Sequence, residues 1–164
     1  HLINRKSIPI SDYFNSLCFI PVAVSYEFDP NDLFKANELH AIATHQEYIK
    51  TDKEDLNSIA NGISGQKGLV NLNIGPPINF IDNSYEACAN LISRSILDLY
   101  QLQPSNFAAC QLQNIKYTLD CNFSNDQINF AKDYLENRTR GLEPGIKALL
   151  LQQYSNPVIQ KEAL

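Results

Sequence analysis

The segment from Phe19 to Pro30 constrains the fold more than any other part of the sequence, because it changes from wholly apolar to polar and then meets a proline. Residues 19–24 carry no polar side chain and are rich in β-branched and aromatic residues, which predicts a buried strand. Residues 25–30 would lead the carboxyl end of that strand into a loop, where open α/β sheets bind their ligands. The sequence therefore predicts an α/β fold with a binding region beyond this strand.

The composition limits both the size of the protein and its partners. With 164 residues, of which 44% are hydrophobic and 19% charged, the chain can bury one core, so it forms one domain or part of one. Its net charge is −5 and its pI is near 5.1. Nucleic-acid binding needs clustered lysines and arginines, which the sequence lacks, so nucleic acid is excluded as the main partner.

Several absences indicate the compartment and the extent of the chain. The sequence has no apolar stretch of about 18 residues, which predicts no transmembrane helix, and its start is not a secretory signal. Four widely spaced cysteines without a Cys-x-x-Cys pair predict buried thiols in a reducing cytoplasm and no metal site: Cys18, Cys88, Cys110 and Cys121. The sequence contains no methionine, which favours a fragment of a longer protein.

A second strand and several helices follow the first strand. The predicted strand at 69–74 alternates apolar residues with Asn71 and Asn73 and is closed by Gly75-Pro76-Pro77. From Asp82 onward the pattern is mainly helical, so we predict two regions, 1–81 and 82–164. Arg138 and Arg140 are expected to complement the dipole at a helix carboxyl end. Before the second strand we predict a short helix or turn within 7–17, a helix that opens at 29–32 and continues through 43, and a helix after a capping box at 51–54 that ends at Gly62 or Gly65. After it we predict a helix from Asn83 or Ser84 that ends by Pro104 and one capped by Ser105 from 106 to about 117. The last two predicted helices run from the capping box at 124–127 to Gly141 and from about 144 to 154.

The segment Ile20-Pro21-Val22-Ala23-Val24-Ser25-Tyr26-Glu27-Phe28-Asp29-Pro30 resembles the last sequence block of the phospholipid/glycerol acyltransferase family, in a long bacterial subgroup similar to 1-acylglycerol-3-phosphate acyltransferases. Further blocks resemble the same subgroup in the same order: 32–36, 54–56, 63–68, 75–78, 104–109 and 154–158. Leu69 departs from the pattern, because a basic residue is expected there. The resemblance implies the distal part of an acyltransferase-type α/β sheet, with two strands in this chain and a mainly helical carboxyl-terminal region packed on it.

The family's proton acceptor is missing from this sequence. Family members use a His-x4-Asp motif, in which the histidine takes the proton from the acceptor hydroxyl and the aspartate orients the imidazole. Five residues after His1, His40 and His45 stand Lys6, His45 and Lys50, so no histidine has the aspartate. We therefore assign no catalytic residue, no metal and no cofactor, and Cys110 and Cys121 stay unassigned as nucleophiles.

The resemblance implies that the complete protein moves a fatty acyl group from acyl-CoA or acyl-carrier protein to a glycerol-phosphate-type lipid acceptor in phospholipid synthesis. It places that protein in the cytoplasm, with peripheral contact to the inner face of the cytoplasmic membrane. Two substrate-binding residues are predicted: Pro21, whose strand would shape the floor of the site, and Lys67, as an anion contact. The alternative interpretation of Lys67 and its neighbouring glycines is a structural turn that leads into the second strand.

Two further alternatives remain open. The chain could be a non-catalytic lipid-binding or protein-interaction module that keeps the distal half of the fold, or a purely structural helical domain. In the family fold the first strand would pair with upstream strands, so the chain by itself is also expected to self-associate through an exposed sheet edge.

Overall fold

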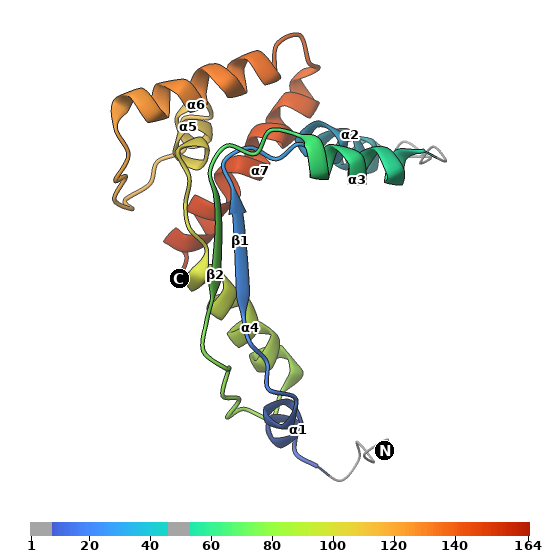
Figure 1. The fold of residues 1–164 in the computed structure, drawn as a ribbon, viewed down its shortest axis with the longest axis vertical. Coiled ribbons are helices and arrows are strands. Elements are labelled where there is room, and N and C mark those ends of the chain that lie inside the picture. Colours follow the sequence, from blue (N-terminus) through green and yellow to red (C-terminus); the bar gives the residue numbers. More distant parts are fainter. Residues whose placement is uncertain (1–7, 46–52) are drawn as a thin grey trace. The chain divides into compact units, whose positions relative to one another are not determined.

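The computed structural model describes residues 8–45 and 53–164, and it is a mixture of helices with a small antiparallel sheet (Figure 1). The α/β class is therefore confirmed, with the two strands that the sequence predicts. In chain order the elements are α1 (Ile10–Leu17), β1 (Val22–Tyr26), α2 (Asp32–Ala43), α3 (Glu54–Ser64), β2 (Val70–Ile74), α4 (Tyr85–Leu99), α5 (Pro104–Leu112), α6 (Asn125–Arg138) and α7 (Pro144–Glu162).

The described chain divides into two compact units, and each is interrupted in sequence. The ribbon unit contains residues 8–25, 71–101 and 164, and therefore α1, α4 and most of the two-stranded sheet. The helical unit contains residues 26–45, 53–70 and 102–163. The division after residue 81 that the sequence suggests stays a prediction.

The two strands form an antiparallel ribbon whose register follows from two hydrogen bonds at its ends. The Glu27 N–H donates to Leu69 O (2.8 Å), and the Gly75 N–H donates to Pro21 O (2.9 Å). Because antiparallel partners add to a constant number, Val22 lies opposite Ile74 and Val24 lies opposite Leu72. All four of these side chains are exposed, whereas Ala23 and Ser25 on the other face are buried. The prediction of a buried first strand is therefore wrong for one of its two faces.

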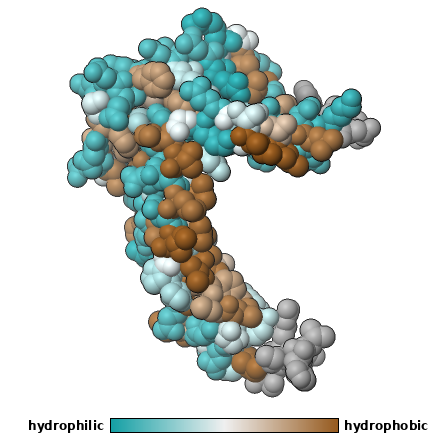
Figure 2. Space-filling model, in the orientation of Figure 1, coloured by the Kyte–Doolittle hydropathy of each residue, from teal (hydrophilic) through white to brown (hydrophobic). Residues whose placement is uncertain are grey.

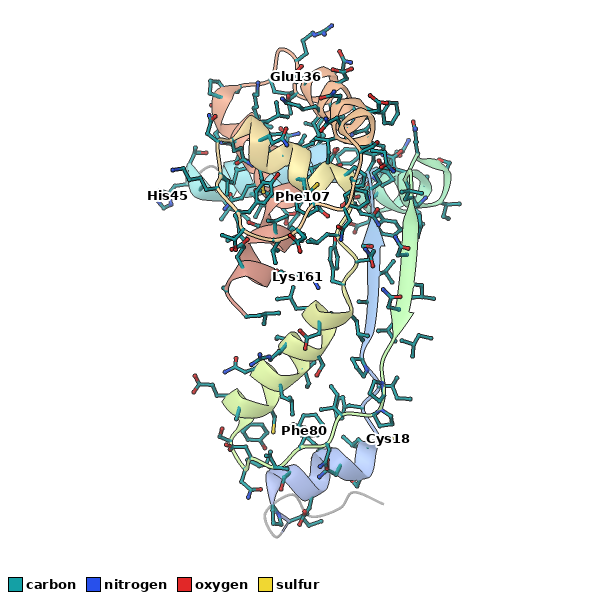
Figure 3. All side chains as sticks on the ribbon, turned by 90° about the vertical axis from the view of Figure 1, so that its left-hand side faces the viewer. Cys18, His45, Phe80, Phe107, Glu136 and Lys161 are labelled. Atoms are coloured by element: carbon teal, nitrogen blue, oxygen red, sulfur yellow. The ribbon has the colours of Figure 1, made fainter. Side chains whose placement is uncertain are left out.

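The helical unit has α5 at its centre. Residues 103–110 are all buried, because α5 packs against both α6 and α7. Phe107 lies among these helices (Figure 3), and its ring contacts Tyr117 and Phe123. The inward faces of α6 and α7 contribute Ile128, Ala131, Leu135 and Leu150 to this core, and Leu149 packs against it.

A buried carboxylate holds α2, α6 and α7 together. Asp32 is fully buried, and its Oδ1 accepts hydrogen bonds from Arg138 Nε (3.0 Å) and Nη2 (2.7 Å). Its Oδ2 accepts the hydroxyl of Tyr154 (2.9 Å), which in turn accepts the Asp29 N–H (2.9 Å). The Arg138 side chain, predicted to face only the helix dipole, therefore satisfies a buried charge 106 residues away in sequence. Its hydrogen bond to Asp32 raises the pKa of Arg138.

Three helix boundaries differ from the sequence prediction. The helix α5 begins at Pro104, with Gln103 rather than Ser105 as its cap, because proline fits the first helical position. It ends at Leu112 rather than near Tyr117. The helix α7 continues past Tyr154 and through Pro157 to Glu162.

Other predicted helix signals give mixed results. The capping boxes at Ser124 and the Ser84 cap are confirmed, and Gly65 ends α3. The capping box proposed at Thr51 lies outside the described residues. In α3 the apolar side chains of Leu56, Ile59 and Ile63 are exposed, with Ile63 78% accessible.

Replacing Asp32 with asparagine tests the buried ion pair. Asp32→Asn keeps the shape but removes the charge that Arg138 pairs with, and breaking such a pair costs about 3–5 kcal/mol when both groups are buried. Because the Arg138 side chain is 34% exposed, we expect a smaller loss, about 2–3 kcal/mol in the free energy of unfolding. Urea unfolding followed by circular dichroism at 222 nm measures it. Lys35→Ala, which removes the exposed pair with Glu38, should cost less than about 0.5 kcal/mol; equal losses would contradict the role of Asp32.

The carboxylate of Glu162 gives a prediction about pH. It accepts hydrogen bonds from the backbone N–H groups of Thr118 and of Leu119 (2.7 Å), and these bonds lower the pKa of Glu162 below its ordinary value of 4.5. A lowered pKa means that this contribution is complete above about pH 4.5 and is lost as the pH falls through the lowered value. Glu162→Gln should therefore unfold at lower urea than the parent at pH 7 but at the same urea near pH 2. An equal difference at both pH values would contradict the prediction.

Candidate functional site

Pro21 lies at the entrance to β1 and lines an open apolar groove inside the ribbon unit. The groove has a volume of about 290 Å³. Its walls are the approach to β1, the loop after β2 and the last turns of α4: Pro21, Pro76, Pro77, Ile78, Asn79, Leu91, Ser95, Asp98 and Leu99. Most of these side chains are apolar, so the groove suits an apolar ligand, with Asn79, Ser95 and Asp98 as its polar members.

Backbone hydrogen bonds fix the loop that forms one wall of the groove. The Gly75 N–H donates to Pro21 O, and the Ile78 N–H donates to Phe19 O (2.8 Å). The loop between these two bonds contains two prolines, which have no N–H to donate and a fixed φ. The wall is therefore held at both ends and stiff in the middle.

A close approach at Gly75 joins the ribbon to α4. A Cβ added to Gly75 would lie 2.8 Å from Leu99 Cδ1 and 2.9 Å from Pro21 Cγ, so only glycine fits without displacing one of them. On the same strand, Asn73 Nδ2 donates to Leu99 O (2.8 Å) and satisfies a carbonyl at the end of α4. Glycine and asparagine thus set the distance between β2 and the helix that completes the groove.

The groove offers binding rather than acid–base or nucleophilic chemistry. None of its lining residues is a histidine, cysteine or lysine, and the Ser95 hydroxyl donates to Leu91 O of its own helix (2.7 Å). The one ionisable side chain in the lining is the carboxylate of Asp98, and the lining holds no histidine to link a carboxylate to a nucleophile. What the arrangement can do is exclude water from an apolar group and orient it.

Lys67, the other predicted binding residue, belongs to the helical unit, so it and Pro21 are described separately. Its ammonium donates to the carbonyls of Gly65 (3.2 Å) and Ile63 (3.4 Å), where α3 ends. A lysine in this position satisfies the last carbonyls of a helix and complements its dipole. The observed contacts of Lys67 are those of a structural cap, and its role as an anion contact stays a prediction.

The glycines beside Lys67 form a turn that leads into β2, as the alternative interpretation of this segment predicts. Gly68 has φ +61°, a conformation that other residues rarely adopt. A Cβ at this position would also overlap the carboxylate of Glu27, which accepts the Leu69 N–H (3.0 Å). Both facts explain the glycine without a nucleotide or phosphate ligand.

The cysteine thiols of the core are not poised to react. Cys110 is fully buried, and burial raises its pKa to about 11, so the thiolate is scarce at neutral pH. Cys88 is also buried, and its thiol donates to Asp82 O (3.6 Å). In the part of the chain that the structure describes, no group of three His, Cys, Asp or Glu side chains could hold a metal ion.

The sequence names Pro21 as a binding residue, which stays a prediction, and it does not indicate the other residues that line the groove. Leu91 and Leu99 of α4 both line the groove. The signal that could have found the groove is the Gly75-Pro76-Pro77 run, since a glycine followed by stiff residues marks a close backbone approach.

Comparisons with known proteins add no relative: no protein-family model, no curated protein and no solved structure matches this chain. Within residues 8–45 and 53–164, no helix combines the length and the apolar character needed to cross a bilayer.

The contact at Gly75 can be tested by adding one methyl group. Gly75→Ala would push Leu99 or Pro21 out of place, and overpacking of this kind costs about 1–3 kcal/mol. We expect a loss within that range in urea unfolding, together with a smaller groove. Gly62→Ala is the matched control, because its Cβ would meet only Asn31 Nδ2 at 3.8 Å, and alanine favours the helix. An unchanged stability in Gly75→Ala would show that the groove wall is not fixed at this point.

Proposed function

We propose that this chain is the carboxyl-terminal part of a glycerolipid acyltransferase, which moves a fatty acyl group from acyl-CoA or acyl-carrier protein to a glycerol-phosphate-type lipid acceptor. The observation that carries the proposal is the groove at Pro21. The residue that the family resemblance singles out for the floor of the site lines an apolar groove of about 290 Å³. A fatty acyl chain or a lipid acceptor is the kind of apolar ligand that such a groove accepts.

In this proposal the groove supplies binding energy and position, and the proton transfer is performed elsewhere. The sequence has no His-x4-Asp motif, and the one ionisable side chain that lines the groove is the carboxylate of Asp98. Binding energy gained away from the reacting atoms can be used to orient them, so a change in the groove can alter turnover as well as affinity. The two strands of the ribbon would be the distal strands of the acyltransferase sheet, and the enzyme would act at the inner face of the cytoplasmic membrane.

The uncovered face of the ribbon also supports this proposal. A two-stranded sheet is marginally stable unless further strands or a helix cover it. Here the ribbon buries Ala23 and Ser25 on one face and leaves Val24 and Leu72 exposed on the other. Further strands of an acyltransferase-type sheet would pair with the open edges of the ribbon and give it the three or more strands that an independently stable sheet needs.

A second candidate function is a non-catalytic lipid-binding module. It is favoured by the same lining, because a mainly apolar groove without a histidine can bind an acyl chain but lacks the family's proton acceptor. The two candidates differ in whether acyl transfer accompanies binding.

The experiment begins with the native polypeptide that carries this segment in its source cell, by intact mass and amino-terminal sequencing. We expect a longer protein with a His-x4-Asp block before Phe19, and acyl transfer from radiolabelled acyl-CoA or acyl-carrier protein to lysophosphatidate. A native mass near 18.5 kDa, with liposome sedimentation but no transfer, would favour the lipid-binding module.

Pro21→Ala in the native protein then tests the groove. Loss of the proline ring removes part of the apolar wall and releases the backbone, so we expect kcat/KM for the acceptor to fall about fivefold, which is about 1 kcal/mol. Pro144→Ala, at an exposed first position of α7, is the matched control and should leave kcat/KM unchanged. Unchanged turnover and acceptor affinity in Pro21→Ala would remove the role assigned to the groove.

A further inference from the structure

Asn79 is a polar residue in the mainly apolar lining of the groove. Figure 2 shows hydrophobic side chains gathered along the two strands, and most residues of the groove lining are also apolar. Asn79 is exposed, and within residues 8–45 and 53–164 its carboxamide makes no hydrogen bond. The folded chain therefore leaves this polar group available to a ligand in the groove.

The side chain of Asn79 can donate hydrogen bonds to a ligand, whereas the other polar side chains of the lining cannot. The Ser95 hydroxyl already donates its proton to Leu91 O (2.7 Å). The carboxylate of Asp98 accepts hydrogen bonds and has no proton to donate. The carboxamide of Asn79 has two N–H donors. Among the described side chains that line the groove, Asn79 is therefore the donor for a ligand.

The main chain is fixed on both sides of Asn79. Before it, the Ile78 N–H donates to Phe19 O (2.8 Å). After it, the side chain of Asn15 forms two bonds with the main chain of Phe80. Asn15 Oδ1 accepts the Phe80 N–H (2.8 Å), and Asn15 Nδ2 donates to Phe80 O (2.8 Å). The Phe80 ring is buried against Phe19, with ring centroids 5.5 Å apart. Asn79 is thus held in place before a ligand arrives, which lowers the cost of binding.

The lining offers no cation to an anionic group. Among the described residues that line the groove, none is a lysine, arginine or histidine, and the ionisable one is Asp98. A phosphate or a free carboxylate would lose its water there without gaining a charged partner. The carbonyl of an ester or thioester is neutral and needs only a hydrogen-bond donor. The groove therefore suits an acyl chain with a neutral carbonyl better than a chain that ends in an anion.

We propose that Asn79 is a specificity-determining residue, whose side-chain N–H groups bind the carbonyl oxygen of a neutral acyl ester or thioester while the acyl chain lies in the groove. Asn15 is its positioning residue, because it acts through Phe80 and does not line the groove. The inference rests on the proposed function for the acyl nature of the ligand. It assigns the acyl part of the substrate to the groove and the phosphate of the acceptor to a place outside it.

Two short lipids that differ in one group test the proposal. The ester 1-octanoylglycerol has a carbonyl where the ether 1-O-octylglycerol has a methylene. Isothermal titration calorimetry with the native protein should give a dissociation constant about fivefold lower for the ester, as expected of one additional hydrogen bond. Octyl phosphate should bind more weakly than the ester, because the groove lining has no cation for it.

Variants of three asparagines identify the residue responsible. Asn79→Asp keeps the shape of the side chain and removes its donors, so the ester and the ether should bind within about twofold of each other. Asn15→Ala should also reduce the preference for the ester, which a general loss of stability would not do. Asn90→Ala is the matched control, since Asn90 is exposed on α4 in the same unit and does not line the groove. It should keep the preference, and circular dichroism checks that each variant is folded.

Three results would overturn the role of Asn79. They are equal affinities of the parent protein for ester and ether, a preference that Asn79→Asp retains, and tighter binding of octyl phosphate than of the ester. A full preference in folded Asn15→Ala would remove the positioning role of Asn15.

These binding measurements need no acyl transfer, so they separate this inference from the proposed function. A preference for the ester in a protein without acyl transfer would support the role of Asn79 and contradict the acyltransferase proposal. Acyl transfer by a protein that binds ester and ether equally would do the reverse.

Discussion

The buried carboxylate of Asp32 is the interaction on which the helical unit depends. Taking a carboxylate out of water costs several kcal/mol, and here the cost is offset by the Arg138 guanidinium, the Tyr154 hydroxyl and the Leu33 N–H (2.6 Å). These partners come from α6, α7 and α2 itself, so the helices must be in place before the charge is satisfied. Burial and the nearby Asp32 charge raise the pKa of Tyr154, which keeps its hydroxyl protonated and able to donate.

The same cluster explains why α5 can be so small and so completely buried. Once α6 and α7 are held by Asp32, the space between them accepts a helix whose fully buried apolar side chains are those of Ala108, Ala109 and Cys110 and one large ring, Phe107. The polar groups of its first turn are also used. Asn106 Nδ2 donates to Tyr154 O (2.8 Å), the backbone carbonyl of the residue whose hydroxyl binds Asp32. Ion pair, helix cap and hydrophobic core are therefore one connected arrangement, and a change in any of them should be felt by the others.

The sequence predicted what is local and missed what depends on distant partners. Helix starts at Ser84 and Ser124 were predictable, because a cap is a matter of a few adjacent residues. Arg138 looked like a dipole partner, since its real partner lies 106 residues away. The first strand looked buried because hydrophobicity records only that a side chain favours burial. Whether something covers it depends on the rest of the fold, and Val24 is 42% exposed. Pro21 could be named from a resemblance, but the groove around it needed α4 and the loop after β2 in place.

The two units differ in how far their apolar side chains find partners, and this difference bears on function. In the helical unit the inward faces of α6 and α7 meet α5, and the unit has a connected core. In the ribbon unit the groove is lined by Pro21, the loop after β2 and α4, whereas one face of the sheet presents Leu72 and Ile74 to solvent. Natural surfaces keep apolar patches of this kind where they bind something. The groove and this exposed face therefore both belong to the ribbon unit, and the hydrogen bond from the Gly75 N–H to Pro21 O joins the end of the sheet to the wall of the groove.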